Sequence, residues 1–182
     1  MKSLETRRCI LRPITLKDDK QLFEFYSQDI VVKYLPFKRH KSIKDTRKFI
    51  KNFFLKNYKK NKIGHFAIVY KSDNKVIGHV GFNNISPKDN EGDIGICINP
   101  SYWGKNLCEE LCKELLRYGF EELNLDKIIA NIYTDNIYSQ KPLEALGFKL
   151  TETFSKNISL NNHVVCNKYQ MSKQDYFKLK SS

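Results

Sequence analysis

The chain has 182 residues, of which 41% are hydrophobic and 29% charged, a balance typical of a folded domain with a full core. No apolar run reaches the roughly 20 residues that cross a bilayer. The first residues carry an early acid and no apolar leader, so we expect a cytoplasmic protein with no membrane partner. We also expect a single domain over residues 1–182.

The net charge of +12 at pH 7 can attract a nucleic acid, an acidic peptide or a polyphosphate cofactor. The basic residues are mostly lysines spread along the chain, and no helix-turn-helix, zinc-finger or RNP pattern accompanies them. A nucleic-acid-binding module is therefore a lesser alternative.

Five cysteines form an odd, scattered set: Cys9, Cys97, Cys108, Cys112 and Cys166. We interpret them as reduced thiols that pack as small apolar side chains. Cys108 and Cys112 share a helical face, but no histidine lies nearby to complete a zinc site. No metal is expected, and a redox or metal role is the alternative.

The first part of the chain predicts one strand and two helices. Residues 6–13 alternate in polarity and end at a proline, which favours a strand. Thr15 and Ser42 each precede apolar residues at helical spacing and can cap the helices that follow.

Strand patterns then dominate, around one long helix. Strands are expected over 65–70, 75–82, 93–98 and 127–133, and two more within 148–171, joined at Asn161 and Asn162. Apolar residues recur at helical spacing from 104 to 123, and a short helix from 139 to 146 ends at Gly147. The order β-α-α-β-β-β-α-β-α-β-β predicts a mixed α/β fold with one right-handed crossover between parallel strands.

The turn before the long helix is the strongest chemical signal. A strand ends at Pro100, and a turn that contains Gly104 leads into the helix. Backbone N–H groups at a helix N-terminus lack partners and carry partial positive charge, so a turn that gathers them can hold a pyrophosphate. A glycine turn by itself is weak support, because many helices begin this way.

Two motifs at the correct spacing support a functional interpretation of this turn. The first motif consists of Pro100, Tyr102, Trp103, Gly104 and Lys105. The second consists of Asn136, Ser139, Leu143, Glu144, Leu146, Gly147 and Phe148. Together they resemble the GCN5-related N-acetyltransferases (GNAT), and most closely the RimJ/RimL-type branch, which acetylates the N-termini of ribosomal proteins. Residues 6–13 and 34–37 also resemble segments of that branch, so the resemblance covers nearly the whole chain.

The resemblance implies a central mixed, mostly antiparallel twisted sheet flanked by helices, with a β-α-β unit that binds acetyl-CoA. In this family a splayed strand binds the pantetheine arm and the turn binds the pyrophosphate. The implied cofactor contacts are Ile96, Cys97, Ile98, Trp103, Gly104, Lys105, Asn106, Leu107, Cys108, Asn136, Ser139 and Lys141. Of these, Asn136 and Ser139 would lie beside the thioester and Lys141 beside a nucleotide phosphate. The family's first helices border the acceptor groove, which implies a substrate-binding role for Tyr34 and Phe37.

The chain departs from the family pattern in its turn and in its general acid. Asn106 replaces the second turn glycine, and Cys108 replaces the usual alanine. Asn tolerates positive φ better than other non-glycine residues, so we expect the turn to survive. Leu143 stands where many members have a tyrosine acid, and Ser139 matches the branch serine thought to assist the leaving thiolate.

The implied reaction is direct transfer, in which a neutral amine attacks the thioester carbonyl and backbone amides near 96–98 stabilise the oxyanion. An α-amine has a pKa near 8 and a lysine one near 10.4, so deprotonating the α-amine is easier by roughly 3 kcal/mol. A modest base therefore suffices. Asp93 and Glu91 are the candidates, and exposed acids at a strand entry are the alternative interpretation.

The leading hypothesis is an acetyl-CoA-dependent enzyme that acetylates a protein N-terminal α-amine. A small amine acceptor, such as a polyamine, an amino acid or an antibiotic, is the first alternative. A non-catalytic acyl-CoA-binding regulatory protein is the second, because a fold alone does not establish activity. Analogy with relatives also suggests a homodimer.

His65 and His79 are expected to be sheet-face residues, with a substrate role as the alternative.

Overall fold

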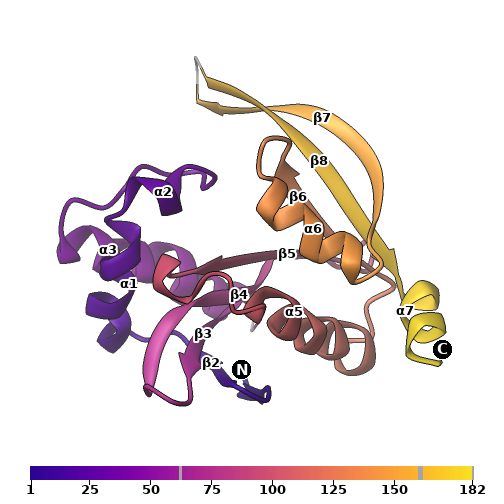
Figure 1. The fold of residues 1–182 in the computed structure, drawn as a ribbon, viewed down its shortest axis with the longest axis horizontal. Coiled ribbons are helices and arrows are strands. Elements are labelled where there is room, and N and C mark those ends of the chain that lie inside the picture. Colours follow the sequence, from indigo (N-terminus) through magenta and orange to yellow (C-terminus); the bar gives the residue numbers. More distant parts are fainter. Residues whose placement is uncertain (62, 160–161, 182) are drawn as a thin grey trace. The chain divides into compact units, whose positions relative to one another are not determined.

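The protein is described by a computed structural model that covers residues 1–61, 63–159 and 162–181 (Figure 1). Eight strands form a sheet in the order β1-β2-β3-β4-β5-β6-β8-β7. Strands β5 and β6 pair in parallel, whereas β1–β2, β2–β3, β3–β4, β6–β8 and β7–β8 are antiparallel. The predicted mixed, mostly antiparallel sheet with flanking helices is confirmed.

The chain divides into two compact units, which are described separately. The first unit comprises Met1–Asn83 and Gly95–Glu114, and the second comprises Asn84–Ile94 and Leu115–Ser182. Strands β4 and β5 and helix α5 continue from one unit into the other along the chain. The single domain over 1–182 stays a prediction.

The first eight elements, up to α4, are β1 (Leu4–Glu5), β2 (Cys9–Pro13), η1 (Leu16–Asp18), α1 (Asp19–Tyr26), α2 (Asp29–Val32), α3 (Ile43–Phe49), η2 (Ile50–Leu55) and α4 (Lys56–Asn61). The middle of the chain forms β3 (His65–Tyr70), β4 (Lys75–Ser86), β5 (Glu91–Ile98), η3 (Pro100–Tyr102), α5 (Leu107–Arg117) and η4 (Tyr118–Glu122). The remaining elements are β6 (Lys127–Tyr133), α6 (Ile137–Ala145), β7 (Lys149–Ser159), β8 (Asn162–Ser172) and α7 (Lys173–Ser181).

Within the described residues, no helix combines the length and the apolar character needed to cross a membrane.

Both predicted helix caps are confirmed. The Thr15 hydroxyl accepts a hydrogen bond from the backbone N–H of Lys17, and Asp18 completes a capping box. Ser42 forms the same box with Asp45. Each box satisfies backbone donors that a helix start leaves without partners, which is why these helices begin where they do.

The predicted first strand over 6–13 begins only at Cys9, as β2, and it pairs antiparallel with the short strand β1. The Thr6 N–H donates to the Cys9 carbonyl at 2.8 Å, and the Cys9 N–H donates to the Thr6 hydroxyl at 3.0 Å. These local bonds form a turn that separates β1 from β2. A threonine side chain that bonds nearby backbone competes with strand pairing, and alternation of polarity does not reveal this.

Other boundaries also differ from the predictions. Helix α5 begins at Leu107 instead of 104, because Gly104 and Asn106 both have positive φ. Helix α6 begins at Ile137, two residues before the predicted start, and β4 extends to Ser86. Helix α7 was not predicted. The predicted join of the last two strands includes Asn161, which lies outside the described residues.

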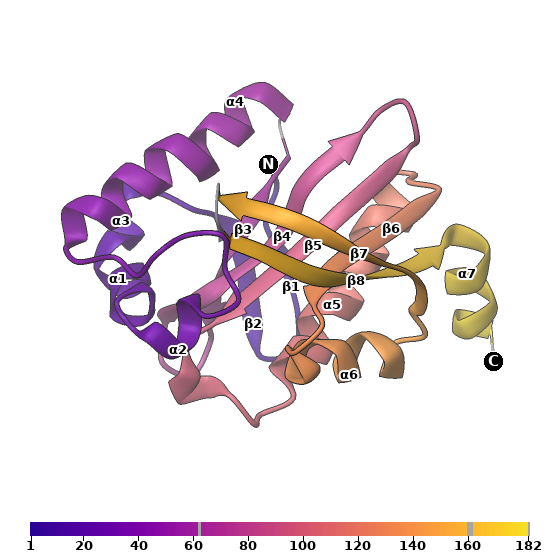
Figure 2. The ribbon, with the colours of Figure 1, turned by 90° about the horizontal axis from the view of Figure 1, so that it is seen from above.

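The first unit has an aromatic core. Figure 2 shows α3, η2 and α4 as one continuous helical run, and the π-helical segment η2 buries Ile50 and Phe54. The Tyr26 ring lies at the centre of the core, with ring centroids 5.3 Å from Phe37 and 5.5 Å from Phe49. Such edge-to-face packing contributes beyond the burial of area alone.

The second unit has its own core, drawn from η4, β6, α6 and β8. Strands β7 and β8 form a long hairpin, and α7 follows directly after β8 (Figure 1). Gly147 ends α6 with φ +92°, as predicted, since glycine adopts this backbone conformation without a steric penalty.

Glu110 connects helix α5 to the N-terminal turn of the first unit. Its carboxylate accepts from the Thr6 hydroxyl at 2.6 Å, from the Arg8 backbone N–H at 2.8 Å and from Arg8 Nε at 2.7 Å. Burial opposes ionisation of Glu110, but the Thr6 and Arg8 hydrogen bonds together hold its pKa below its usual value. The ionised carboxylate therefore stabilises the fold.

We predict that Glu110→Gln lowers the free energy of unfolding by about 1–3 kcal/mol at pH 7, because a charged hydrogen-bond acceptor is lost. Since the pKa is lowered in the folded state, the advantage of the native chain is full above about pH 5 and disappears as the pH falls through the folded pKa. Urea unfolding at pH 3 to 7 measures this. Glu109→Gln is the matched control, because the exposed Glu109–Lys113 pair contributes about 0.5 kcal/mol or less. Equal losses in both variants would contradict the prediction.

Candidate active site

The predicted pyrophosphate turn of the first unit is exposed and has an unusual backbone. Gly104 has φ +73° and Asn106 has φ +54°, so two residues of the turn are left-handed. Both residues, with Lys105 between them, are exposed. A Cβ atom at Gly104 would meet no heavy atom within 4 Å, so a ligand can approach this backbone closely. When left-handed and right-handed residues alternate along a turn, their successive backbone N–H groups point toward one place. Such an arrangement suits an anion.

Trp103 holds the turn against the end of β5. Its indole N–H donates to the Ile98 carbonyl at 2.7 Å, while 49% of the residue remains exposed. Tyr102 adds a second attachment, because its hydroxyl donates to Asp73 at 2.5 Å. Both aromatic side chains therefore fix the turn from outside and leave its backbone amides accessible.

Lys105 is held over aromatic rings. Its ammonium lies 4.9 Å from the centroid of Tyr102 and 5.6 Å from that of Tyr70. The Lys105 carbonyl accepts from the Arg8 guanidinium at 2.8 Å. Arg8 and Glu110 thus position the turn, a role that no sequence motif had indicated.

The three predicted arm-binding residues lie at the end of β5. Ile96 and Ile98 are half-buried, and Cys97 is 8% exposed and packs in the aromatic core. Burial raises the pKa of the Cys97 thiol to about 12, so this cysteine is not a nucleophile at neutral pH. Strand β4 approaches closely, since a Cβ at Gly78 would lie 2.2 Å from the Cys97 carbonyl oxygen.

The first turn of α5 follows. Leu107 is buried, so a cofactor contact there would use its backbone. Cys108 is half-buried, and a hydrogen bond involving Cys112, partly opposed by burial, lowers the pKa of its thiol.

All five cysteines are free. In the described part of the chain, no group of three His, Cys, Asp or Glu residues has a metal-binding arrangement.

The second unit carries the remaining predicted cofactor residues at the start of α6. Asn136 is the N-cap residue and Ser139 lies in the first helical turn, both half-buried, whereas Lys141 is exposed. The helix is held by Tyr169, whose hydroxyl bonds to Gln140 at 3.0 Å and to Glu144 at 2.8 Å. The motif glutamate therefore has a structural partner in the sheet.

The two candidate bases of the second unit lie on β5. Glu91 forms an ion pair with Lys127 at 2.9 Å, across the parallel β5–β6 register. Accepting a proton would break this pair, which makes Glu91 the weaker candidate. Asp93 is half-buried and stands opposite Ile129.

The predicted substrate residues lie in the segment after α2. Tyr34 is half-buried, with the Lys33 ammonium 4.9 Å from its ring centroid. The Phe37 ring packs 4.7 Å from Phe49, so this residue contributes to the aromatic core. His65 and His79 are buried on the sheet face, as expected.

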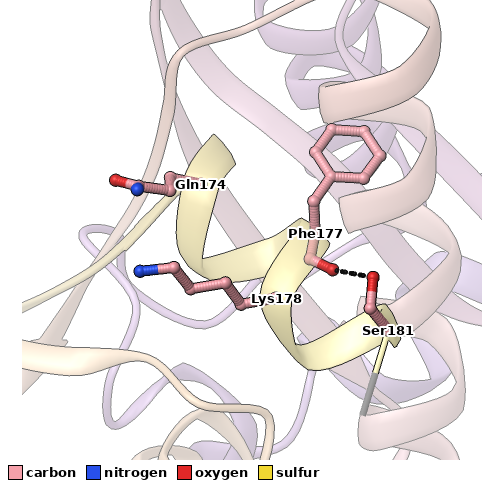
Figure 3. Close-up of a pocket in the computed structure, with 4 residues that line it drawn as sticks. All are labelled: Gln174, Phe177, Lys178 and Ser181. Carbon is pink, nitrogen blue, oxygen red and sulfur yellow. Dashed lines mark hydrogen bonds between the residues drawn. The ribbon is translucent and has the colours of Figure 1, made fainter.

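A shallow hollow on helix α7 contains none of these residues. Figure 3 shows its lining side chains, Gln174, Phe177, Lys178 and Ser181, along one exposed helix. The Ser181 hydroxyl donates to the Phe177 carbonyl at 2.8 Å, a bond within the helix. Since no buried polar group converges on it, we assign it no catalytic role.

Comparison with known proteins identifies the family. A family model described as an acetyltransferase (GNAT) domain matches residues 8–149. The uncharacterized N-acetyltransferase p20 of Bacillus licheniformis is 32% identical over 152 residues, covering 82% of this chain and 83% of that protein. The chain belongs to the GNAT family, in its RimJ/RimL-like branch, and is an acetyl-CoA-dependent N-acetyltransferase.

Solved structures share the fold. The ribosomal-protein-S5-alanine acetyltransferase of Vibrio fischeri has a TM-score of 0.80 at 23% identity, covering 97% of this chain and 99% of that one. The spermidine N-acetyltransferase of Vibrio cholerae, solved with CoA and spermine, has a TM-score of 0.78 at 19% identity, covering 93% and 98%. Their names describe acceptors of two kinds, so this likeness leaves the acceptor of the present chain open.

We predict that the left-handed conformation at residue 106 is required for cofactor binding. Asn106→Gly keeps this conformation and should retain acetyl-CoA affinity within about threefold. Asn106→Val should lower affinity about tenfold or more, because a β-branched residue strains a positive φ by roughly 1–3 kcal/mol. Titration calorimetry measures both affinities.

The matched control is Asn124→Val, which imposes similar strain at φ +56° in the second unit. It should lower stability without changing acetyl-CoA affinity. If Asn106→Val bound acetyl-CoA as tightly as the native chain, the turn would not be the phosphate site.

Proposed function

We propose that this enzyme transfers acetyl from acetyl-CoA to the N-terminal α-amine of a protein. The exposed, left-handed turn at Gly104 and Asn106 carries the cofactor side of the proposal, because it supplies unencumbered backbone donors where the family binds pyrophosphate. Trp103, Lys105, Leu107 and Cys108 contribute backbone to the same turn, and residues 96–98 contribute to the arm. Bound acetyl-CoA supplies a thioester carbonyl that an amine can attack.

An α-amine acceptor suits the modest bases available. Its pKa near 8 leaves a useful neutral fraction at pH 7, whereas a lysine side chain near 10.4 is almost fully protonated. Asp93, acting through a water, is our candidate base, since Glu91 is engaged by Lys127. The Vibrio fischeri homologue, described as acting on a ribosomal-protein alanine, supports a protein acceptor.

A small polyamine acceptor remains the second candidate, supported by the spermidine enzyme of Vibrio cholerae. The formal charge of +12 disfavours it, because a basic protein repels a polycation at long range. Membership of an enzyme family favours catalysis over the regulatory alternative. The five free cysteines support action in the cytoplasm, where thiols stay reduced.

A measurement of CoA release with different acceptors distinguishes the acceptor classes. We would supply acetyl-CoA with a short peptide that has a free N-terminal alanine, the same peptide with a blocked N-terminus, and spermidine. The proposal requires release with the free peptide and little with the other two. Release with spermidine alone would replace the proposal by its alternative.

We propose Ser139 as the group that assists departure of the thiolate. Leu143, at the tyrosine position of many relatives, is 4% exposed and has no acidic proton. Ser139→Ala should lower kcat roughly 10²-fold, within the range of general acid catalysis, while the acetyl-CoA dissociation constant stays unchanged. Ser101→Ala, at an exposed residue of η3, controls for loss of a surface hydroxyl. An unchanged kcat in Ser139→Ala would remove the serine from the mechanism.

We also propose that β7 joins two copies of the chain. It is the last strand in the sheet order, and most of its described side chains are exposed. Between its two register shifts, residues 152–157 can pair antiparallel with a second copy about Phe154. In that register Glu152 of each copy faces Lys156 of the other, and the two Phe154 rings meet, so the edge is self-complementary.

Charge reversal tests this pairing. Glu152→Lys places like charges opposite each other and should shift the protein toward monomer in analytical ultracentrifugation at micromolar concentration. Adding Lys156→Glu restores complementarity and should restore the dimer. A native protein that sediments as a monomer would refute the proposed interface.

A further inference from the structure

A chain of polar side chains leads from the core of the first unit to its surface. The Nδ1 atoms of His79 and His65 lie 2.9 Å apart, and His65 Nε2 lies 2.9 Å from Asn83 Oδ1. His65 is 2% exposed and His79 is 7% exposed, whereas Asn83 is exposed. Strands β3 and β4 thus carry a hydrogen-bonded path with one buried end and one open end.

The hydrogen-bond partners determine which ring nitrogens carry protons along this path. An amide oxygen only accepts, so His65 Nε2 carries the proton given to Asn83. Burial lowers the pKa of His65 to about 4, so the ring is neutral at pH 7. Since Nε2 holds the proton of the neutral ring, Nδ1 carries none. The proton between the rings therefore belongs to His79 Nδ1. With its oxygen engaged by His65, Asn83 presents its Nδ2–H groups to the surface.

The buried end of the path costs stability. In the part of the chain that the structure describes, neither His79 Nε2 nor the Tyr26 hydroxyl has a hydrogen-bond partner. The surroundings are aromatic, with the Phe54 ring centroid 5.2 Å from that of His79. Phenylalanines at both positions 65 and 79 would fit such a core without an unsatisfied polar atom. A histidine pair at this cost points to a role at its open end.

The open end of the path, Asn83 on β4, lies against β5. The Asn83 amide atoms stand 3.0 Å from the place that a Gly95 Cβ would occupy. Gly95 directly precedes residues 96–98, to which the proposed function assigns the thioester arm and the oxyanion. Because Gly95 has no side chain, the exposed Asn83 amide can lie directly against the β5 backbone, next to residues 96–98.

We propose that Asn83 binds a carbonyl oxygen of the acceptor through Nδ2–H, and that His65 and His79 are positioning residues that hold the amide in this orientation. This inference rests on the proposed acetyl transfer and specifies its acceptor class. An N-terminal α-amine has a carbonyl two bonds away, within reach of such a donor. A polyamine has only nitrogen groups and cannot accept this bond while protonated. The site therefore selects amines that carry an adjacent carbonyl.

The sharpest test removes the carbonyl from the acceptor. Two peptides with a free N-terminal alanine are compared, one native and one whose first amide is replaced by a trans-alkene of the same shape. For the native chain we expect kcat/KM to favour the amide peptide about tenfold or more, the effect of one well-placed hydrogen bond. In Asn83→Asp, which keeps the His65 contact but has no amide donor, the ratio should fall close to one.

Asn84→Asp is the matched control, because it makes the same change at the next residue of β4, on the opposite strand face. It should keep the native ratio. His79→Phe releases the His65 ring and should reduce the ratio mainly through KM, with unchanged acetyl-CoA affinity. A merely structural role for His79 would change stability and leave the peptide ratio intact.

The outcomes distinguish the two proposals. If the peptide is acetylated and the native chain and Asn83→Asp show the same ratio, the Asn83 inference is wrong and the proposed function stands. If acetyl-CoA binds but no peptide is acetylated, both are overturned.

Discussion

The left-handed backbone at Gly104 and Asn106 is the constraint on which the proposed cofactor site depends. A helix N-terminus offers partial positive charge wherever it occurs, but only a turn of alternating hand directs several N–H groups to one point. The molecule stabilises this turn without covering it. Trp103 attaches it to the end of β5, and Arg8 bonds the Lys105 carbonyl from the other side. Asparagine at 106 adopts the positive φ of this turn, which it tolerates better than other non-glycine residues.

The first unit combines this turn, which follows β5, with a buried polar path on β3 and β4. Core positions usually gain most from apolar side chains, so the His65–His79 pair is an exception that requires an explanation. Its outer partner, Asn83, lies against Gly95 on β5. A donor fixed in orientation before the ligand arrives loses little entropy on binding, which favours selection among acceptors by hydrogen bonding. Burial keeps both imidazoles neutral, so the path adds no charge that would repel an ammonium.

Sequence reasoning succeeded where a local rule decides the structure. Thr15 and Ser42 were predicted as caps because their hydroxyls satisfy donors three residues or fewer away. The φ values of Asn106 and Gly147 follow from properties of those residue types. It failed at Thr6, where a side chain that bonds the backbone forms a turn between β1 and β2, and at helix α7, whose apolar pattern is weak. The assignment of Phe37 to the substrate stays a prediction, and the structure adds that the Phe37 ring packs against Phe49.

By itself, the sequence determined the family, most of the element order and the glycine-containing turn before helix α5, because these depend on spacing and on local backbone preference. Only the tertiary structure decided that Arg8 and Glu110 hold that turn, since they are 102 positions apart in the chain. It likewise brought His65 and His79 to Asn83, through the antiparallel pairing of β3 with β4. Hydrogen bonds between distant residues depend on which strands become neighbours. That outcome results from the packing of the whole chain, and no local pattern encodes it.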